Sequence, residues 1–310
     1  MLPVYFAPLQ GYTDFVYRAA HHTLVGGVGE YYTPFIRWEH GGVRNKDLRD
    51  VAPQNNQGVP TVPQVIAKNR DELCRLCDLL QETGWRRIDL NMGCPFPMQV
   101  HAGRGSGLLV HEDLVAEILE EMGRRKEVSF SVKMRLGQTS PEEGVRLLPL
   151  INDAPLESLT LHPRLGTDQY RGSASREAFQ AFYEMCRVPM IFNGDITAPE
   201  EIEQLETAFP RLKGVMVGRG LLARPTLAKE YAEGATLDNT QRLDIALQMH
   251  QRILEHATNT LQGDTQILNR MRAFWEYQGE ILPKKTYKHL MKCGTMRTYR
   301  EALAATHHLS

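Results

Sequence analysis

The chain has 310 residues, and its 36 Lys and Arg residues against 37 Asp and Glu residues give a formal net charge of −1 at pH 7. This balance excludes a whole-molecule field that would attract nucleic acid or a membrane, so any such partner has to be contacted by a local patch. No uncharged run reaches the roughly 18 residues of a membrane span and the first residues lack a basic, apolar leader, so we expect a cytoplasmic protein with no membrane partner.

Short apolar runs predict eight β-strands in the first 235 or so residues. These runs are residues 3–7, 29–35, 61–67, 87–91, 130–136, 158–163, 189–194 and 214–220. Helical periodicity lies between most of them, for instance at 69–83, 112–125, 141–152, 175–186 and 198–208. This alternation is typical of a parallel sheet with right-handed crossovers, and eight such units close most economically as a (β/α)8 TIM barrel of the α/β class.

The placement of the candidate site residues favours the barrel over a doubly wound sheet, which would show the same alternation. They fall at the C-terminal ends of nearly all the predicted strands: Ala7, Pro8, Gln64, Asn91, Cys94, Lys133, His162, Asn193, Asp195, Gly218 and Arg219. In a barrel these ends converge on one mouth, whereas an open sheet spreads them along an edge. We therefore expect a single site at the mouth of a barrel.

The pattern changes to continuous helix near residue 239. Helical segments cover 240–262, 265–282 and 283–305, and no strand signal remains. Gly, Asn, Asp and Thr interrupt the helix between 231 and 240, which predicts a boundary there. We expect a barrel domain over 1–235 and an all-helical domain over 239–310.

Two late glycine-bearing turns predict a phosphate site. "FNGDI" (192–196) ends the seventh predicted strand and "VGRGLL" (217–222) ends the eighth. Barrel enzymes commonly hold a phosphate at these two loops, on backbone N–H groups at a helix N-terminus. Each turn alone is a weak signal, but their joint position favours binding of a phosphate or a phosphorylated cofactor.

Lys133 and His162 are candidate ligand contacts on two of the predicted strands. Ser131, Lys133 and Arg135 share one face of their strand, because side chains alternate along a strand. Such a polar face inside a barrel suggests a binding site, although a lysine can also extend to the rim with its ammonium in water. His162 ends an apolar strand, where a ligand-facing role competes with that of a buried core histidine.

Cys94 lies at the end of the fourth predicted strand, after Gly93 and before Pro95. A nucleophilic cysteine needs a nearby histidine base, and His101 and His111 stand at no recognisable spacing from it. A thiol near its ordinary pKa of about 8.5 is mostly protonated at neutral pH, which suits a general acid. The glycine-rich segment 101–109 that follows could form a mobile cover over the mouth.

The other cysteines predict no metal site and no disulfide framework. The five cysteines are an odd number spread through the chain, which fits a reducing compartment. Cys74 and Cys77 form a C-x-x-C pattern, but their segment has helical periodicity and the chain offers no second pair of ligands. We interpret them as a packing pair and expect no metal.

Several blocks of the sequence together resemble, in order, the signature segments of the tRNA-dihydrouridine synthases. They are "APLQGYTD" (7–14), "PQV" (63–65), "DLNMGCPFPMQVHAGRGSGLL" (89–109), "SVKMRLG" (131–137), "LHPR" (161–164), "YRG" (170–172), "FNGDI" (192–196) and "MVGRGLLARP" (216–225). The resemblance covers the whole predicted barrel. It implies an FMN-dependent barrel enzyme that reduces the C5–C6 double bond of a uridine in tRNA, with NADPH as the source of the hydride.

The resemblance also implies roles for individual residues. The implied FMN contacts are Ala7, Pro8, Leu9, Gln64, Lys133, His162, Asn193, Gly194, Asp195, Gly218 and Arg219. Asn91 is implied as a uracil contact, and Cys94 as the acid that protonates C5 after a hydride reaches C6. Negative charge then develops on the C4 oxygen, which Lys133 or Arg164 could stabilise.

This sequence departs from the family pattern at a few positions beside the expected mouth. Pro163 and Leu165 replace the glycine and the hydroxyl residue that usually follow the histidine, and Leu9 and Gln10 replace a common methionine and acidic residue. These positions border the flavin and the nucleotide. They bear on which uridine is chosen more than on flavin binding.

A basic segment near the C-terminus predicts the RNA contact, for a protein expected to be a monomer. Residues 281–300 hold six basic residues and no acidic one: Lys284, Lys285, Lys288, Lys292, Arg297 and Arg300. Tyr287 and Tyr299 lie between them, and Arg270 and Arg272 precede the segment. Local patches of this kind supply phosphate contacts, although a solvated helix face is the alternative. We expect the target uracil to be flipped out of the RNA into the barrel mouth.

Two other functions remain open from the sequence alone. One is an FMN barrel reductase of a free pyrimidine or another small ene substrate, which would need no basic helical domain. The other is an RNA-binding barrel without catalysis. The presence of Asn91, Cys94, Lys133 and His162 together argues against the second.

Overall fold

The computed structural model describes residues 1–306, and its strands form one parallel sheet. The strands are β1 (Val4–Phe6), β2 (Glu30–Tyr32), β3 (Thr61–Val62), β4 (Gln64–Val65), β5 (Arg87–Met92), β6 (Ser129–Gly137), β7 (Leu156–Leu165), β8 (Met190–Asn193) and β9 (Gly214–Val217). Their order in the sheet is β3-β2-β1-β9-β8-β7-β6-β5-β4.

The sheet closes into a barrel because its two end strands are neighbours in the chain. Pro63 alone separates β3 from β4, and as a proline it has no N–H for a sheet ladder. Its carbonyl still accepts from the backbone N–H of Asp89 at 2.9 Å. The third predicted strand is therefore one barrel strand that is interrupted at Pro63, and the predicted (β/α)8 barrel is confirmed.

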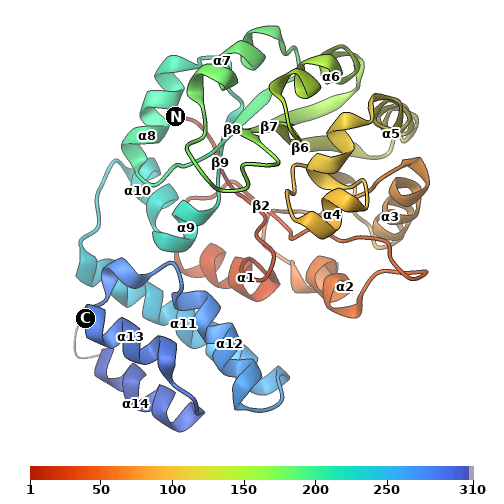
Figure 1. Ribbon diagram of the computed structural model, residues 1–310. Helices are drawn as coiled ribbons and strands as arrows, with labels where there is room; N and C mark the ends of the chain where they lie inside the picture. Colours follow the sequence, from red (N-terminus) through yellow and green to blue (C-terminus); the bar gives the residue numbers. More distant parts are fainter. Residues whose placement is uncertain (307–310) are drawn as a thin grey trace.

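Helices surround the strands and complete the barrel (Figure 1). They are α1 (Phe15–Leu24), α2 (Asn45–Val51), α3 (Arg70–Glu82), α4 (Pro97–His101), α5 (Glu112–Arg124), α6 (Pro141–Asp153), α7 (Arg176–Met185), α8 (Pro199–Ala208), α9 (Arg219–Ala223) and α10 (Leu227–Glu233). Short 3-10 turns lie at Pro53–Asn55 and Gly105–Val110. Side-chain caps start several helices, as where Asn69 accepts from the N–H of Glu72 at 3.1 Å. The five helices predicted from periodicity are confirmed within one or two residues at each end.

The interior of the barrel is apolar on one side and polar on the other. Tyr5, Tyr32, Val62, Ile191 and Met216 form a small cluster separate from the main core. The inward positions of the neighbouring strands β4 to β6 carry polar side chains instead, because alternation turns the apolar residues of these strands outward to the helices. This polar half of the interior forms the floor of the site.

The C-terminal part of the described chain is helical throughout. It contains α11 (Asn239–Thr260), α12 (Asp264–Trp275), a 3-10 turn at Gly279–Ile281, α13 (Lys284–Lys292) and α14 (Met296–Thr306). The predicted helical segment 283–305 is thus two helices. Trp275 Nε1 donates to Tyr299 Oη at 2.8 Å in the core of this region. Tyr299 is buried, so its predicted place on an RNA-facing surface is wrong.

The helical region is joined to the barrel through the loop that follows β1. Arg270 Nη2 pairs with Asp14 Oδ1 at 2.7 Å, and Tyr12 Oη donates to Glu276 Oε2 at 2.8 Å. The ring of Phe15 packs edge-on against His256, with 5.4 Å between ring centroids. These contacts fix the helical region beside the barrel. The division into domains 1–235 and 239–310 stays a prediction.

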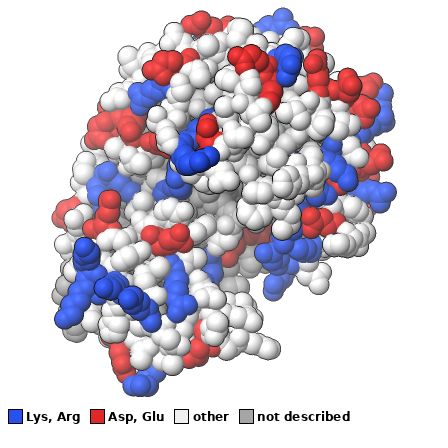
Figure 2. All heavy atoms as spheres, viewed as in Figure 1, with Lys and Arg blue, Asp and Glu red and all other residues white. Residues whose placement is uncertain are grey.

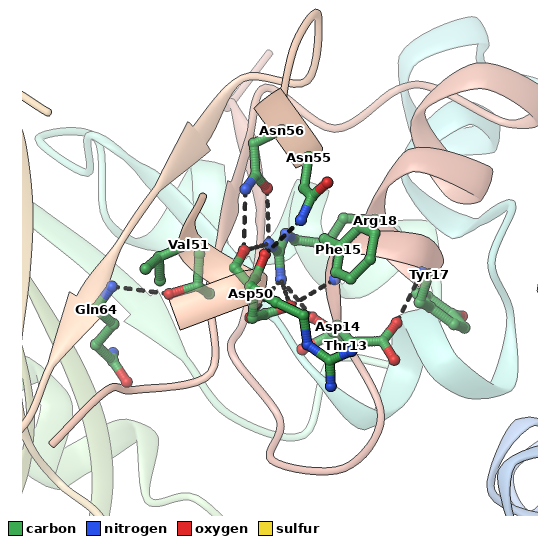
Figure 3. A network of polar contacts seen from close by, with 12 residues as sticks. Thr13, Asp14, Phe15, Tyr17, Arg18, Asp50, Val51, Asn55, Asn56 and Gln64 are labelled. Carbon is green, nitrogen blue, oxygen red and sulfur yellow. Dashed lines mark hydrogen bonds and ion pairs between the residues drawn. The ribbon is translucent and has the colours of Figure 1, made fainter. Parts of the chain in front are cut away.

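A buried ion pair fixes this loop from its other side (Figure 3). Arg18 on α1 bonds to Asp50 of α2 and, through Nη2, to Asn56 Oδ1 at 2.7 Å. Asp50 Oδ1 also accepts from the backbone N–H of Phe15 at 2.6 Å. Arg18 is almost fully buried, so its charge depends on these partners.

Asp50→Ala tests this network. The variant leaves the Arg18 guanidinium buried without its carboxylate, and we expect the free energy of unfolding to fall by about 3–5 kcal/mol. Urea denaturation measures it. Arg49→Ala is the control, since Arg49 is exposed on the same helix and its loss should change stability by less than about 0.5 kcal/mol. A loss for Asp50→Ala no larger than for the control would contradict the role of the pair.

Candidate active site

A cavity of about 1250 Å³ opens at the C-terminal ends of the strands. It exceeds the range of about 300–1,000 Å³ that is usual for ligand pockets. Its lining includes all the predicted cofactor contacts and the two predicted residues of the fourth strand: Ala7, Pro8, Leu9, Gln64, Asn91, Cys94, Lys133, His162, Asn193, Gly194, Asp195, Gly218 and Arg219. The geometry therefore brings these residues together, while their individual roles stay predictions.

A chain of hydrogen bonds in one direction crosses the floor of the cavity. Asp89 accepts from Ser131 Oγ at 2.5 Å and from Gln64 Nε2 at 2.7 Å. Gln64 Oε1 then accepts from Asn91 Nδ2 at 2.8 Å. Asn91 Oδ1 in turn accepts from the backbone N–H of Cys94 at 2.8 Å. The buried carboxylate thereby orients both amides and the turn that carries the thiol.

Asp89 was missed as a site residue by the sequence analysis. It is completely buried, and burial raises its pKa to about 6, against the opposing effects of its hydrogen bonds and of Lys133. A carboxylate inside the apolar run 87–91 is the signal that could have identified it. Its acceptor-only character when ionised is what fixes the direction of the hydrogen bonds.

Lys133 places an ammonium group on the cavity wall. In the strand register, Lys133 of β6 lies opposite Asn91 of β5. Within residues 1–306, no carboxylate lies at ion-pair distance from the Lys133 ammonium. Burial and the nearby Arg135 lower its pKa to about 8, although Asp89 opposes the shift. A half-buried, unpaired ammonium favours an anionic or electron-rich ligand at this wall.

The turn of Cys94 is held tightly from one side. The carbonyl of Cys94 accepts from the backbone N–H and the Oγ of Ser106, both at 3.0 Å. Gly105 has φ +59°, and a Cβ there would lie 2.5 Å from the Cys94 carbonyl oxygen, so only glycine fits. The glycine-rich segment therefore packs against the thiol loop, which differs from the expected mobile cover.

The surroundings of Cys94 keep its thiol protonated. Burial raises the pKa of this thiol. A hydrogen bond with the backbone of Phe96 and the positive charges of Arg135 and Lys133 oppose the shift only in part. No histidine of the described chain hydrogen-bonds to it, and neither His101 nor His111 lines the cavity. The structure thus shows no histidine hydrogen-bonded to Cys94 as a nucleophile would require, and the protonated thiol fits a proton donor.

The ring of His162 is fixed as the neutral tautomer with its proton on Nδ1. Asn193 Nδ2 donates to the carbonyl of Met216 at 2.7 Å, which turns its Oδ1 towards His162 Nδ1 at 3.2 Å. Arg164 Nη1 donates to His162 Nε2 at 3.1 Å. Burial and the nearby Lys133 lower the pKa of His162 well below its usual value. Both ring nitrogens are engaged, so the ring meets a ligand through its face or edge.

Asp195 joins the two late glycine turns at the cavity rim. It has φ +44°, a left-handed conformation that is uncommon for residues other than glycine. Its carboxylate pairs with Arg164 at 2.6 Å and with Arg219 at 3.2 Å, and the two cations lower its pKa against the effect of burial. The Arg219 guanidinium lies over the ring of Tyr170, 4.7 Å from its centroid. Phosphate binding at these turns stays a prediction.

Several predicted substrate contacts lie outside the cavity. Arg164 is buried behind His162, where Asp195 and the carbonyls of Arg171 and Gly172 bind it. Arg270 is engaged by Asp14, and Arg272 donates to the carbonyls of Met291 and Cys293. The remaining predicted contacts are exposed on α13 and do not line the cavity: Lys284, Lys285 and Lys288.

The structure adds residues to the mouth that the sequence analysis did not single out. The added lining residues include Phe35, Arg37, Arg44, Lys46, Phe96, Tyr170 and Tyr277. Arg135 ties two loops together, since it donates to the carbonyls of Gly93 at 3.0 Å and Leu165 at 2.7 Å. Alternation on β6 had placed Arg135 on the face of Lys133, and both residues line the cavity.

The fold and the cavity define a (β/α)8 barrel with a ligand site at the C-terminal ends of its strands. The family described as Dihydrouridine synthase (Dus) matches residues 5–308. The chain belongs to this family. Within residues 1–306, no helix combines the length and apolarity that a membrane crossing requires.

Curated relatives agree with this assignment, and solved structures show the same fold. The tRNA-dihydrouridine synthase B of Pseudomonas aeruginosa is 30% identical over 72% of this chain and 67% of its own length. The tRNA-dihydrouridine(16) synthase of Neisseria meningitidis is 27% identical over 78% of this chain and 76% of its length. Morphinone reductase, 10% identical over 76% of this chain and 87% of its own, has a TM-score of 0.54, which shows a shared fold.

Lys133→Met tests the unpaired ammonium. The pKa of about 8 lies below the roughly 10.4 of an unfolded lysine, so the charge destabilises the fold fully below pH 8. We expect the ligand-free variant to be more stable than the wild type at pH 7 by about 1–3 kcal/mol. The gain should shrink as the pH rises from 8 to about 10.

Urea denaturation of both proteins at pH 7 and pH 10 provides the measurement. Lys68→Met serves as the matched control, because Lys68 lies beside Glu72, with 3.6 Å between the charged atoms, and is half-exposed. A Lys133→Met protein that is less stable than the wild type at pH 7 would show that the ammonium is stabilised where it lies.

Proposed function

We propose that this chain reduces the C5–C6 double bond of a uridine in tRNA to dihydrouridine, with FMN bound in the cavity and NADPH as the reductant. The observation that carries the proposal is the convergence of the Cys94 thiol, the Lys133 ammonium and the Asn91 amide on one large cavity. Family membership and the names of the curated relatives support it. We further propose that the enzyme acts in the cytoplasm as a monomer.

The residues of the cavity fit a flavin mononucleotide. The volume of about 1250 Å³ leaves room for a flat tricyclic ring and for a pyrimidine beside it. Lys133 and Gln64 would meet the polar edge of the ring, where an unpaired ammonium favours electron-rich atoms. The turns at Gly194 and Gly218 would hold the phosphate, with Arg219 beside them. When bound, FMN would supply the hydride that is added to C6 of the uracil.

The chain's own residues would supply the proton and the orientation. Cys94 would donate its proton to C5, and its thiolate would then recover a proton from water. Burial keeps the thiol protonated at neutral pH, as this role requires. Of the two cations considered for the developing negative charge on the C4 oxygen, Lys133 lines the cavity and Arg164 does not.

Asn91 would bind the uracil while it holds the thiol loop. Its Oδ1 accepts from the backbone N–H groups of Gly93 and Cys94, at 3.0 and 2.8 Å. One N–H of its amide is used by Gln64, so the second remains for a uracil oxygen. A single amide would then fix the base relative to the proton donor.

The RNA would be held by local basic patches. Figure 2 shows Lys and Arg side chains gathered on the helical region at the lower left. Lys284, Lys285 and Lys288 are exposed on α13, and none of them forms an ion pair within residues 1–306. Such free cations suit phosphate contacts, whose counterion release makes binding dependent on salt.

Cys94→Ala tests the proposed reaction. We expect the variant to bind FMN and to be reduced by NADPH as the wild type is, but to form dihydrouridine at least 10² to 10⁴ times more slowly, the usual contribution of a general acid. The measurement combines the bleaching of the flavin absorbance with dihydrouridine analysis of a tRNA that lacks the modification. Cys74→Ala, on α3 and away from the cavity, is the control. Undiminished product from Cys94→Ala would remove the assigned role.

Replacing the three lysines of α13 tests the RNA surface. In a Lys284→Gln, Lys285→Gln, Lys288→Gln variant we expect weaker tRNA binding and a salt dependence flatter by up to about 2–3 units of log Kd against log salt. Binding titrations at several salt concentrations measure both. The matched control removes three solvent-exposed basic residues of the barrel, Arg49, Arg176 and Arg187. Equal slopes of log Kd against log salt in the two variants would show that the RNA does not bind at α13.

A further inference from the structure

Two large apolar side chains are exposed directly after the thiol loop. Phe96 is 57% exposed and Met98 is 59% exposed. Phe96 lines the rim of the cavity together with Pro95 and Pro97. Single exposed apolar residues are common, but an exposed apolar pair at the rim of a ligand site indicates a surface that contacts a binding partner.

The backbone presents Phe96 outward from a rigid frame. Prolines on both sides restrict it, and its φ of −65° and ψ of 126° are the extended values that a following proline favours. The Phe96 carbonyl accepts from the N–H groups of Gln99 and Val100, at 2.8 and 3.1 Å. The backbone of Phe96 is therefore held by the fold, and its ordering adds no entropic cost when a partner binds.

The inner face of α4 is anchored, which leaves Phe96 and Met98 on the outer side. Gln99 is 1% exposed. Val100 packs so closely on the next segment that a Cβ at Gly107 would lie 2.5 Å from its carbonyl oxygen. A rotation of α4 that buried the two apolar residues would break this contact.

Phe96 is more than half exposed to solvent. Within residues 1–306 it has no aromatic or cation–π partner, whereas Tyr170, the other exposed aromatic ring of the rim, lies against the guanidinium groups of Arg135 and Arg219. Arg37, Arg44 and Lys46 line the same mouth. Arg37 pairs with Glu39 and Arg44 with Asp47, whereas Lys46 forms no ion pair within residues 1–306 and would meet a phosphate of a nucleic acid.

We propose that Phe96, with Met98 beside it, is the platform on which the base next to the target uridine stacks. The proposal rests on the proposed function, since it takes the occupant of the cavity to be a nucleotide of an RNA chain. Moving a uridine into the cavity unstacks its neighbours, and an aromatic ring at the rim replaces the lost stacking. The base must pass the rim because it is covalently linked to the buried nucleotide.

Phe96→Ala and Phe96→Tyr separate stacking from other effects. A base stacked on an aromatic side chain is stabilised by about 1–3 kcal/mol, so Phe96→Ala should weaken tRNA binding by about 5- to 150-fold. Phe96→Tyr keeps the ring and should remain within about twofold of the wild type. Circular dichroism and the melting temperature show whether each variant is folded. Binding by Phe96→Ala that equals the wild type would overturn the proposal.

An abasic nucleotide on either side of the target uridine identifies the stacked base. For one of the two abasic tRNAs, we expect weaker binding to the wild type than intact tRNA shows. Phe96→Ala should bind this abasic tRNA and intact tRNA equally, because the variant has already lost the stacking that the missing base would provide. Losses that add fully at both positions would overturn the proposal. If the wild type binds tRNA in this Phe96-dependent way but forms no dihydrouridine, the proposed reaction fails and the platform stands.

Discussion

A single buried carboxylate fixes the direction of the hydrogen bonds on which the site depends. Asp89 can only accept when ionised, so Gln64 must turn its amide N–H groups towards it. Gln64 then offers its carbonyl to Asn91, and Asn91 offers its own carbonyl to the turn of Cys94. Three strands of the barrel and the thiol loop are thereby held in one arrangement before any ligand binds, which is the preorganisation that a catalytic site needs.

The barrel interior also contains a charged group that lowers the stability of the fold. One half is filled with apolar side chains such as Tyr5, Tyr32 and Ile191 and packs as an ordinary core. The other half holds the half-buried Lys133 without a carboxylate partner at ion-pair distance among the described residues, and desolvation with the nearby Arg135 lowers its pKa to about 8. An uncompensated charge of this kind lowers the stability of the free protein and is retained where a ligand supplies the missing partner.

The fold and most of the cavity lining could be predicted from the sequence because both follow local rules. Strand ends converge in a barrel, and alternation assigns the face of Lys133 and Arg135. The missed features depend on contacts between distant segments. Asp89 reads as part of an apolar strand until Gln64 and Ser131 are placed beside it. The ion pairs of Arg164 with Asp195 and of Arg270 with Asp14 join segments that are far apart in the sequence, so no sequence spacing predicts them. Helical periodicity alone could not show that Tyr299 faces a core.

The most direct test of the central claim is the flavin content of the purified protein. We predict a yellow protein that releases one FMN per chain on denaturation, and a Lys133→Met protein that retains distinctly less, because the ammonium at the cavity wall would contact the ring. A colourless protein that cannot be reconstituted with FMN would contradict a flavin site in this cavity. So would a Lys133→Met protein that binds FMN as tightly as the wild type.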